Sequence, residues 1–188
     1  MFCCGGKEGP PCNALQVALV VNIPCENIEF HLQKTHDTFS LENLLQSHQI
    51  QDSSREADFY NNTEQEKVET MSVKKSIMLY RRPNDGPKLL FVHGWNGRSS
   101  QFYRIIDLLS ENGYDITSID LPGHGRSSRS STNLPEIIDL VAEMMASSGP
   151  YYGVVCHSFG GVAALNALRH GAICEKLVLI SPGTFSYT

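Results

Sequence analysis

The chain has 188 residues, of which 41% are apolar and 19% charged, so it can form one ordinary globular domain with a core and a smaller additional segment. The net charge of −5 is unevenly distributed, because residues 1–70 carry 4 Lys and Arg against 11 Asp and Glu, whereas residues 71–188 carry 11 against 9. No basic stripe is present, which excludes nucleic acid as an expected partner.

Residues 1–63 show no sustained periodicity, and stretches such as QIQDSSREADFYNNTEQE are polar enough to predict a poorly ordered acidic extension. Only residues 39–48 have a short helical pattern. The apolar run 14–21 is too short to span a bilayer and lacks a basic leader, so the sequence predicts a cytoplasmic protein with no membrane span. The N-terminal cysteines fit no zinc spacing, and no metal is predicted from them: Cys3, Cys4, Cys12 and Cys25.

Residues 64–188 form a second region, in which predicted strands and helices alternate. This pattern predicts a partial α/β domain. Apolar runs and turn residues predict six strands, at 67–73, 76–82, 88–92, 114–120, 151–156 and 176–181. Helical periodicity predicts three helices, within 99–113, 134–149 and 158–171. Alternating strands and helices with fully apolar strands predict a mostly parallel sheet that is covered by helices on both faces.

Two of the predicted helices have one apolar face each. The first face consists of Phe102, Ile105, Ile106 and Leu109, and the second of Leu134, Ile138, Val141 and Met145. Cys156 and Cys174 lie inside apolar segments and are predicted to be small buried hydrophobic residues.

Three loops follow predicted parallel strands at their carboxyl ends, where open α/β sheets bind ligands. They are HGWNG at 93–97, DLPGHGRSS at 120–128 and CHSFGG at 156–161. In this order and at these strand ends, the three motifs resemble the α/β-hydrolase superfamily, in its lipase, esterase and acyltransferase branch, over roughly residues 67–183. The resemblance implies an α/β-hydrolase fold that is truncated after its sixth strand.

The resemblance also implies the roles of the site residues. Ser158 would be the nucleophile on a sharp strand-to-helix turn, with Cys156 in place of the first glycine of the family's G-x-S-x-G motif. The backbone amides of Trp95 and Phe159 would form the oxyanion hole. His93 and Gly94 would belong to the substrate-binding side of the same loop, with His93 orienting the loop.

The family's catalytic base is not found where the resemblance places it, because the triad runs from serine to an acid and then to a histidine. After Ser158 the only acid is Glu175 and the only histidine is His170, in the reverse order. His170 lies twelve residues along the predicted helix, about 18 Å from the serine, which is far beyond hydrogen-bond reach.

Other histidines remain as alternatives for the base. His157 adjoins the serine but points elsewhere on a tight turn. His93 or His124 could approach Ser158 from a facing loop, with Asp120 as the nearest candidate acid to orient either of them.

Three hypotheses follow from the incomplete triad. The chain is part of a longer serine hydrolase that cleaves a carboxylic ester or thioester of a small acyl substrate, it pairs with a second polypeptide that supplies the missing residues, or it is a non-catalytic binding module. The last predicted strand would form an exposed sheet edge, which favours self-association or a partner chain that completes the sheet. Serine at the turn argues against the branches that use aspartate there, and no metal or organic cofactor is implied.

Overall fold

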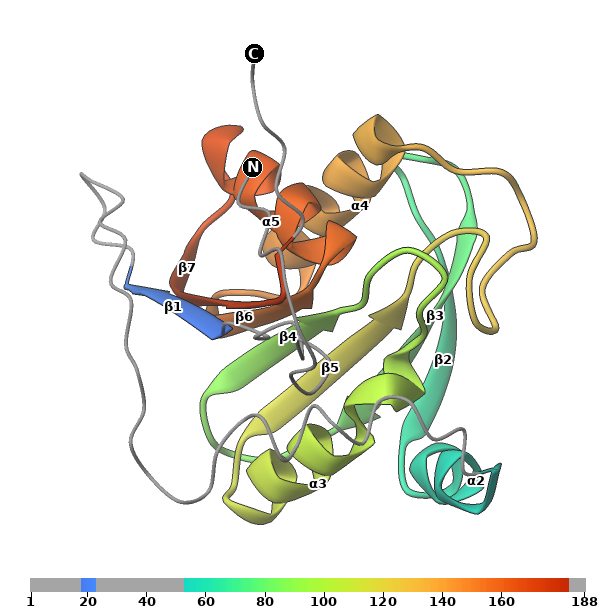
Figure 1. Ribbon diagram of the computed structural model, residues 1–188, viewed down its shortest axis with the longest axis vertical. Coiled ribbons are helices and arrows are strands. Elements are labelled where there is room, and N and C mark those ends of the chain that lie inside the picture. The colour runs from blue at the N-terminus through green and yellow to red at the C-terminus, as the bar shows by residue number, and fades with distance from the viewer. Residues whose placement is uncertain (1–17, 23–52, 183–188) are drawn as a thin grey trace, which may run out of the picture.

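The computed structural model of the chain describes residues 18–22 and 53–182. These residues form one seven-stranded sheet with helices on both sides (Figure 1). The strands are β1 (Ala18–Asn22), β2 (Glu64–Glu69), β3 (Ser76–Arg82), β4 (Lys88–Val92), β5 (Asp115–Asp120), β6 (Tyr151–His157) and β7 (Cys174–Ile180). The helices are α2 (Ser53–Asn61), the 3₁₀ turn η2 (Ser99–Phe102), α3 (Tyr103–Glu111), α4 (Leu134–Ser147) and α5 (Phe159–Arg169).

The sheet is mixed, with the order β1-β7-β6-β4-β5-β3-β2. Its centre is parallel, because β4 pairs with both β5 and β6, and β6 pairs with β7. The antiparallel pairs lie toward the two edges, where β3 joins β5 and β2 on one side and β1 joins β7 on the other. The four parallel strands confirm the predicted α/β architecture, and they bring their carboxyl ends to one side of the sheet.

Both faces of the parallel strands are buried, and β4 shows this in the alternation of its side chains. Leu90 and Val92 point into one core, and Leu89 and Phe91 point into the other. Helices α4 and α5 cover the first face, while α2 and α3 cover the second (Figure 1). Two-sided burial explains why β4 is an almost continuous apolar run.

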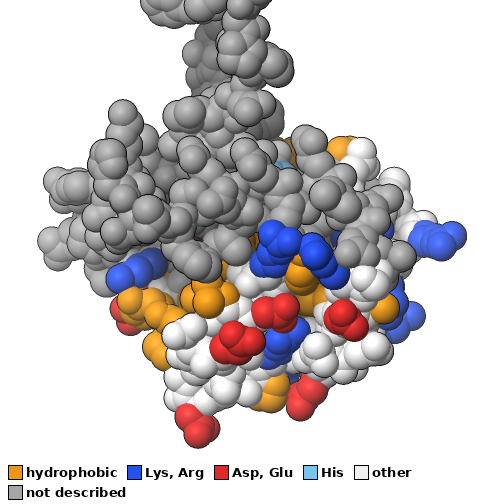
Figure 2. Space-filling view, turned by 60° about the horizontal axis from the view of Figure 1, so that its bottom comes forward, with side chains coloured by type: hydrophobic (Ala, Val, Ile, Leu, Met, Phe, Trp, Pro, Cys, Tyr) orange, Lys and Arg blue, Asp and Glu red, His pale blue; other side chains and the backbone are white. Residues whose placement is uncertain are grey.

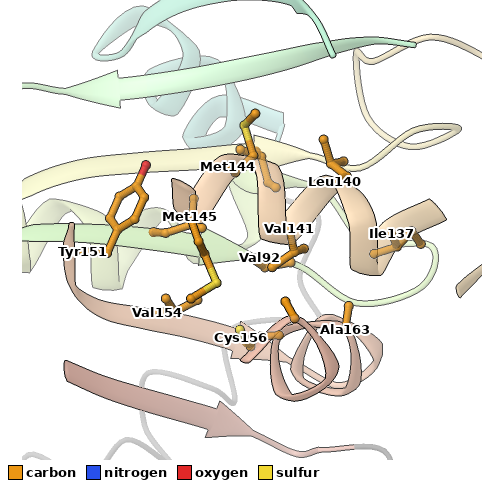
Figure 3. Packing of buried hydrophobic residues seen from close by; sticks show 14 of the residues in the cluster. Val92, Ile137, Leu140, Val141, Met144, Met145, Tyr151, Val154, Cys156 and Ala163 are labelled. Carbon is orange, nitrogen blue, oxygen red and sulfur yellow. The ribbon is translucent and has the colours of Figure 1, made fainter. Parts of the chain in front are cut away.

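The first core lies between the sheet and α4 and α5, and Figure 3 shows its packing. The apolar face of α4 differs from the predicted one, because Leu134 and Ile138 are only partly buried. The fully buried positions of α4 are Ile137, Leu140, Val141, Met144 and Met145. The helix is so apolar on several sides that periodicity alone did not identify the side that faces the sheet. For η2 and α3, three of the four residues of the predicted face, Phe102, Ile105 and Ile106, are buried, and the fourth, Leu109, is partly buried.

Two elements lie inside the range that the sequence assigned to a poorly ordered extension. Helix α2 packs Phe59 and Tyr60 against Tyr80 of β3, with ring centroids 5.3 and 5.4 Å from the Tyr80 ring. The prediction of disorder was therefore wrong for residues 53–63: two aromatic residues are enough to attach an otherwise polar helix to the core. The predicted helix at 39–48 and the N-terminal cysteines lie outside the described residues.

Strand β1 is the second of these elements, and it changes the expected edge of the sheet. It pairs antiparallel with β7, from Ala18 opposite Ile180 to Asn22 opposite Lys176. The edge of β7 that the sequence predicted to be exposed is therefore occupied by a segment of the same chain.

On the face shown in Figure 2, basic and acidic side chains alternate over the part that grey atoms do not cover. Within residues 18–22 and 53–182, no helix is long and apolar enough to cross a membrane.

Candidate active site

The three loops singled out in the sequence follow three neighbouring strands. Strands β6, β4 and β5 are adjacent in the sheet and parallel, so the segments that begin at Ser158, His93 and Leu121 leave the sheet at the same edge. This topology brings motifs that are about 30 residues apart in the sequence to one place.

Ser158 lies on a strained turn between β6 and α5. Its φ is 49° and its ψ is −117°, a backbone conformation that residues other than glycine rarely adopt. The turn is fixed by two backbone hydrogen bonds, from the Ser158 N–H to the Ile180 carbonyl at 2.9 Å and from the Gly161 N–H to the Ser158 carbonyl at 3.0 Å. The residue is partly exposed, and its Oγ makes no hydrogen bond with any described residue. Within residues 18–22 and 53–182, the hydroxyl therefore has no structural hydrogen bond.

Small residues around this turn leave no room for larger ones. A Cβ on Gly160 would lie 2.5 Å from the His93 carbonyl oxygen and 2.7 Å from that of Val92, so helix α5 begins directly against the end of β4. Cys156, which stands in place of the family's first glycine, is fully buried and faces the core beside Ala163 (Figure 3). Burial raises the pKa of its thiol well above the usual value, so Cys156 is an inert packing residue.

The loop after β4 lies against the turn at Ser158. A Cβ on Gly94 would come within 2.9 Å of the Ser158 Cβ and within 3.1 Å of the His157 carbonyl oxygen. Gly94 and Gly97 close a tight turn through a 3.0 Å hydrogen bond, with Asn96 at a positive φ of 57°. Only glycine at position 94 lets this loop approach the serine so closely.

The two amides that the sequence assigned to the oxyanion hole border this contact. Trp95 follows Gly94 in the turn, and Phe159 is the first residue of α5. Neither backbone N–H has a hydrogen-bond partner in the described part of the chain. An amide at the first position of a helix has no partner within the helix, so the Phe159 N–H is available to an oxyanion.

His93 is the residue that begins the loop after β4. It is fully buried; its Nε2 accepts a 2.9 Å hydrogen bond from the Leu121 N–H, and its Nδ1–H donates to the Gly94 carbonyl at 2.7 Å. Because a backbone N–H can only donate, the ring is neutral with its proton on Nδ1. Burial lowers the pKa of His93 to about 4. His93 therefore ties two loops together, and its geometry supports neither the predicted substrate contact nor a role as the base.

Asp120 connects the same loops to the sheet from below. It is fully buried, and its carboxyl group accepts hydrogen bonds from the Ser99 N–H at 2.7 Å, the Arg126 N–H at 2.8 Å and the Tyr80 hydroxyl at 2.9 Å. A Cβ on Gly125 would lie 2.0 Å from its Oδ2, which explains the glycine there. Asp120 is thus a structural acceptor and orients no histidine among the described residues. The sequence did not show this role, because two of the three donors, the Ser99 N–H and the Tyr80 hydroxyl, are distant from Asp120 in the chain.

Trp95 packs edge-on against two other rings. Trp95 has 53% of its surface exposed, and its ring centroid lies 5.4 Å from that of Phe159 and 5.2 Å from that of His124. The Nδ1–H of His124 donates to the Pro122 carbonyl at 2.9 Å. These contacts pack the loop after β4 against the loop after β5 and the start of α5.

No histidine of the described region hydrogen-bonds Ser158. His170 lies at the C-terminal end of α5, the helix that starts immediately after the serine, which agrees with the separation of about 18 Å expected from the rise per residue. His157 is half-buried, and burial lowers its pKa. Residues 18–22 and 53–182 also contain no group of three or more His, Cys, Asp and Glu side chains that could hold a metal ion.

A family model described as the alpha/beta hydrolase fold matches residues 87–187. The human serine hydrolase-like protein is 32% identical over 106 residues, which cover 53% of this chain and 52% of that protein. The pimeloyl-[acyl-carrier protein] methyl ester esterase of Vibrio atlanticus is 30% identical over 98 residues, which cover 51% of this chain and 36% of that protein. The chain therefore spans about half the length of the human serine hydrolase-like protein, and it spans less than half the length of the other relatives.

Solved structures of low sequence identity share the fold. The epoxide hydrolase VrEH1 from Vigna radiata has a TM-score of 0.53 and 21% identity, covering 61% of this chain and 40% of that one. The thioesterase domain from the curacin biosynthetic pathway has a TM-score of 0.51 and 23% identity, covering 59% of this chain and 43% of that one. At these identities the likeness concerns the fold alone.

Proposed function

Because the chain belongs to the α/β-hydrolase fold family, we propose that it is part of a serine hydrolase in which Ser158 attacks the carbonyl carbon of a carboxylic ester or thioester. The observation that carries the proposal is the positive φ of 49° at Ser158, on a turn that faces Gly94. Strain of this kind is retained at sites where a side chain must be held in one position. The relative named as a methyl ester esterase supports an ester as the substrate.

The chemistry would proceed in two steps. The Ser158 Oγ forms a bond to the carbonyl carbon while its proton passes to a base, and the carbonyl oxygen becomes an oxyanion between the Trp95 and Phe159 amides. Loss of the alcohol or thiol leaves an acyl-enzyme, which water then hydrolyses to the acid. Each oxyanion donor is typically worth about 10²–10³ in rate.

No hydrogen bond joins the Ser158 hydroxyl to a histidine in the part of the chain that the structure describes, so the base and its acid partner are a matter of proposal. We propose that they come from polypeptide outside this part, either in the same protein or in a second chain. No metal or organic cofactor takes part in this proposal, and the cytoplasmic location stays a prediction of the sequence.

A second candidate function is a non-catalytic binding module of the same fold. It is favoured by one observation: no hydrogen bond joins the Ser158 hydroxyl to a histidine or carboxylate of the described residues.

We expect a fluorophosphonate probe to label Ser158, with its phosphorus bonding to Oγ and fluoride leaving. Imidazole added to the buffer should accelerate labelling, because it replaces the missing base and accepts the hydroxyl proton. Intact-protein mass spectrometry and peptide mapping would locate the label.

Ser158→Ala should abolish labelling. Ser181→Ala is the matched control, because Ser181 also has a positive φ, of 44°, at the end of a parallel strand. If the folded protein stays unlabelled with and without imidazole, the binding module is the better account; if Ser158→Ala labels like the wild type, the proposed nucleophile is wrong.

A further inference from the structure

A hollow lies beside the loops that follow β4 and β5. It has a volume of about 400 Å³ and is lined by Glu56, Ala57, Tyr60, Arg98, Gly125 and Arg126. One wall comes from α2, which lies outside the 87–187 match, and the other walls come from the loops after β4 and β5. The hollow is therefore built partly from this chain's own N-terminal helix.

The carboxylate of Glu56, in the wall of the hollow, already has hydrogen-bond and ion-pair partners within the protein. The Glu56 Oε1 accepts hydrogen bonds from the Tyr60 hydroxyl and the Ser100 hydroxyl, each at 3.1 Å, and pairs with the Arg98 Nε at 3.0 Å. These contacts hold α2 to the start of η2, immediately after the loop that contains Gly94 and Trp95.

Arg126 is held flat against the wall. Its guanidinium lies 3.5 Å from the centre of the Tyr60 ring, and its Nη1 donates to the Gln65 side chain at 3.1 Å. Stacking fixes the plane of the guanidinium and leaves the N–H groups at its edge to form hydrogen bonds. The remaining N–H groups of Arg98 and Arg126, and the Gly125 amide, have no partner in the part of the chain that the structure describes.

The walls therefore combine two guanidiniums with one carboxylate that is already paired, and they hold several unused donors. Planar guanidinium groups with free N–H donors match the oxygens of a carboxylate or a phosphate. We propose that this hollow, the Arg98–Arg126 pocket, binds a carboxylate or phosphate group of a small ligand.

The position of the pocket connects it with the reaction site. Arg98 directly follows the loop at 93–97, and Gly125 follows His124, whose ring packs on Trp95. If the proposed function holds, the anion would be the charged end of a substrate whose acyl group reaches Ser158. That connection rests on the proposed function, whereas binding of the anion does not.

The test is a titration of the isotopically labelled full chain at constant ionic strength, followed by NMR at the Gly125 amide and the arginine Nε–H groups. Pyrophosphate and glutarate are the two probes, and the one that binds more tightly identifies a phosphate or a carboxylate as the preferred group. Saturable shifts at these positions are the expected result.

Arg126→Gln should weaken binding about tenfold, the size of a lost charge-assisted hydrogen bond. Arg129→Gln is the matched control, because it removes the same charge from an exposed position on the same loop outside the pocket, and it should change the affinity less than twofold. Ala57→Glu places a negative charge on an exposed position of α2 and should also weaken binding.

The proposal is overturned if neither anion gives saturable shifts, or if Arg129→Gln weakens binding as much as Arg126→Gln. Fluorophosphonate labelling of the same samples separates the two proposals. Labelling without anion binding removes only the pocket, and anion binding without labelling removes only the nucleophile.

Discussion

Replacing Asp120 with alanine is expected to lower the free energy of unfolding by about 3–5 kcal/mol, one of the largest effects of any single substitution near the site. The carboxyl group accepts from the Ser99 N–H, the Arg126 N–H and the Tyr80 hydroxyl, and it is fully buried. Each buried donor that is left without an acceptor costs about 1–3 kcal/mol. Chemical denaturation followed by circular dichroism measures the change.

The same substitution should slow fluorophosphonate labelling, because the loops after β4 and β5 both lose their attachment to the sheet. Tyr80→Phe is the matched control: it removes one donor, leaves the other two bonds of Asp120 in place, and should cost about 1 kcal/mol. An Asp120→Ala protein that is as stable as Tyr80→Phe would show that Asp120 does not hold the two loops.

Acidification should weaken the fold through His93, by about 3 kcal/mol in total. Burial lowers the pKa of His93 to about 4, against about 6.5 for an exposed histidine. Between these values the unfolded chain binds the proton more tightly, so the contribution of neutral His93 is complete above pH 6.5 and is lost as the pH falls toward 4. Burial also lowers the pKa of His157, so this residue acts in the same direction.

His93→Gln isolates this effect, because glutamine retains an acceptor but cannot titrate. The variant should be less stable at pH 7, and its difference from the wild type should shrink by about 3 kcal/mol between pH 7 and pH 4. His170→Gln, at the exposed end of α5, serves as the control for replacing a histidine with glutamine. If the difference in the free energy of unfolding between His93→Gln and the wild type is the same at pH 7 and pH 4, His93 is not buried in its neutral form.

The order of the elements followed from the sequence because the parallel strands are apolar on both faces. The positions of β3, β4 and α4 match the expected ranges closely, and Asn133 begins α4 by accepting from the Glu136 N–H at 3.0 Å. The prediction that the polar N-terminal region is poorly ordered was wrong at α2. There, the packing of two aromatic side chains on the core holds a helix whose other residues are mostly polar. The pairing of β1 with β7 is a long-range contact that no local pattern indicates.

The candidate site was predictable in its motifs but not in its supporting contacts. The roles of Ser158, Trp95 and Phe159 were predicted from loop motifs that resemble those of the family, and they stay predictions. The roles of His93 and Asp120 depend on donors from other loops, such as the Leu121 N–H, which only the folded chain brings together. The contact between Glu56 and Arg98 joins two segments more than 40 residues apart, and no motif marks it.

A crystal structure of the chain after reaction with a fluorophosphonate probe tests the central claim most directly. The phosphorus should be bonded to the Ser158 Oγ, with one phosphonyl oxygen within about 3 Å of the amide nitrogens of both Trp95 and Phe159. A phosphonyl oxygen that points into solvent, or an adduct on any other residue, would show that the strained turn does not present a nucleophile to an oxyanion hole.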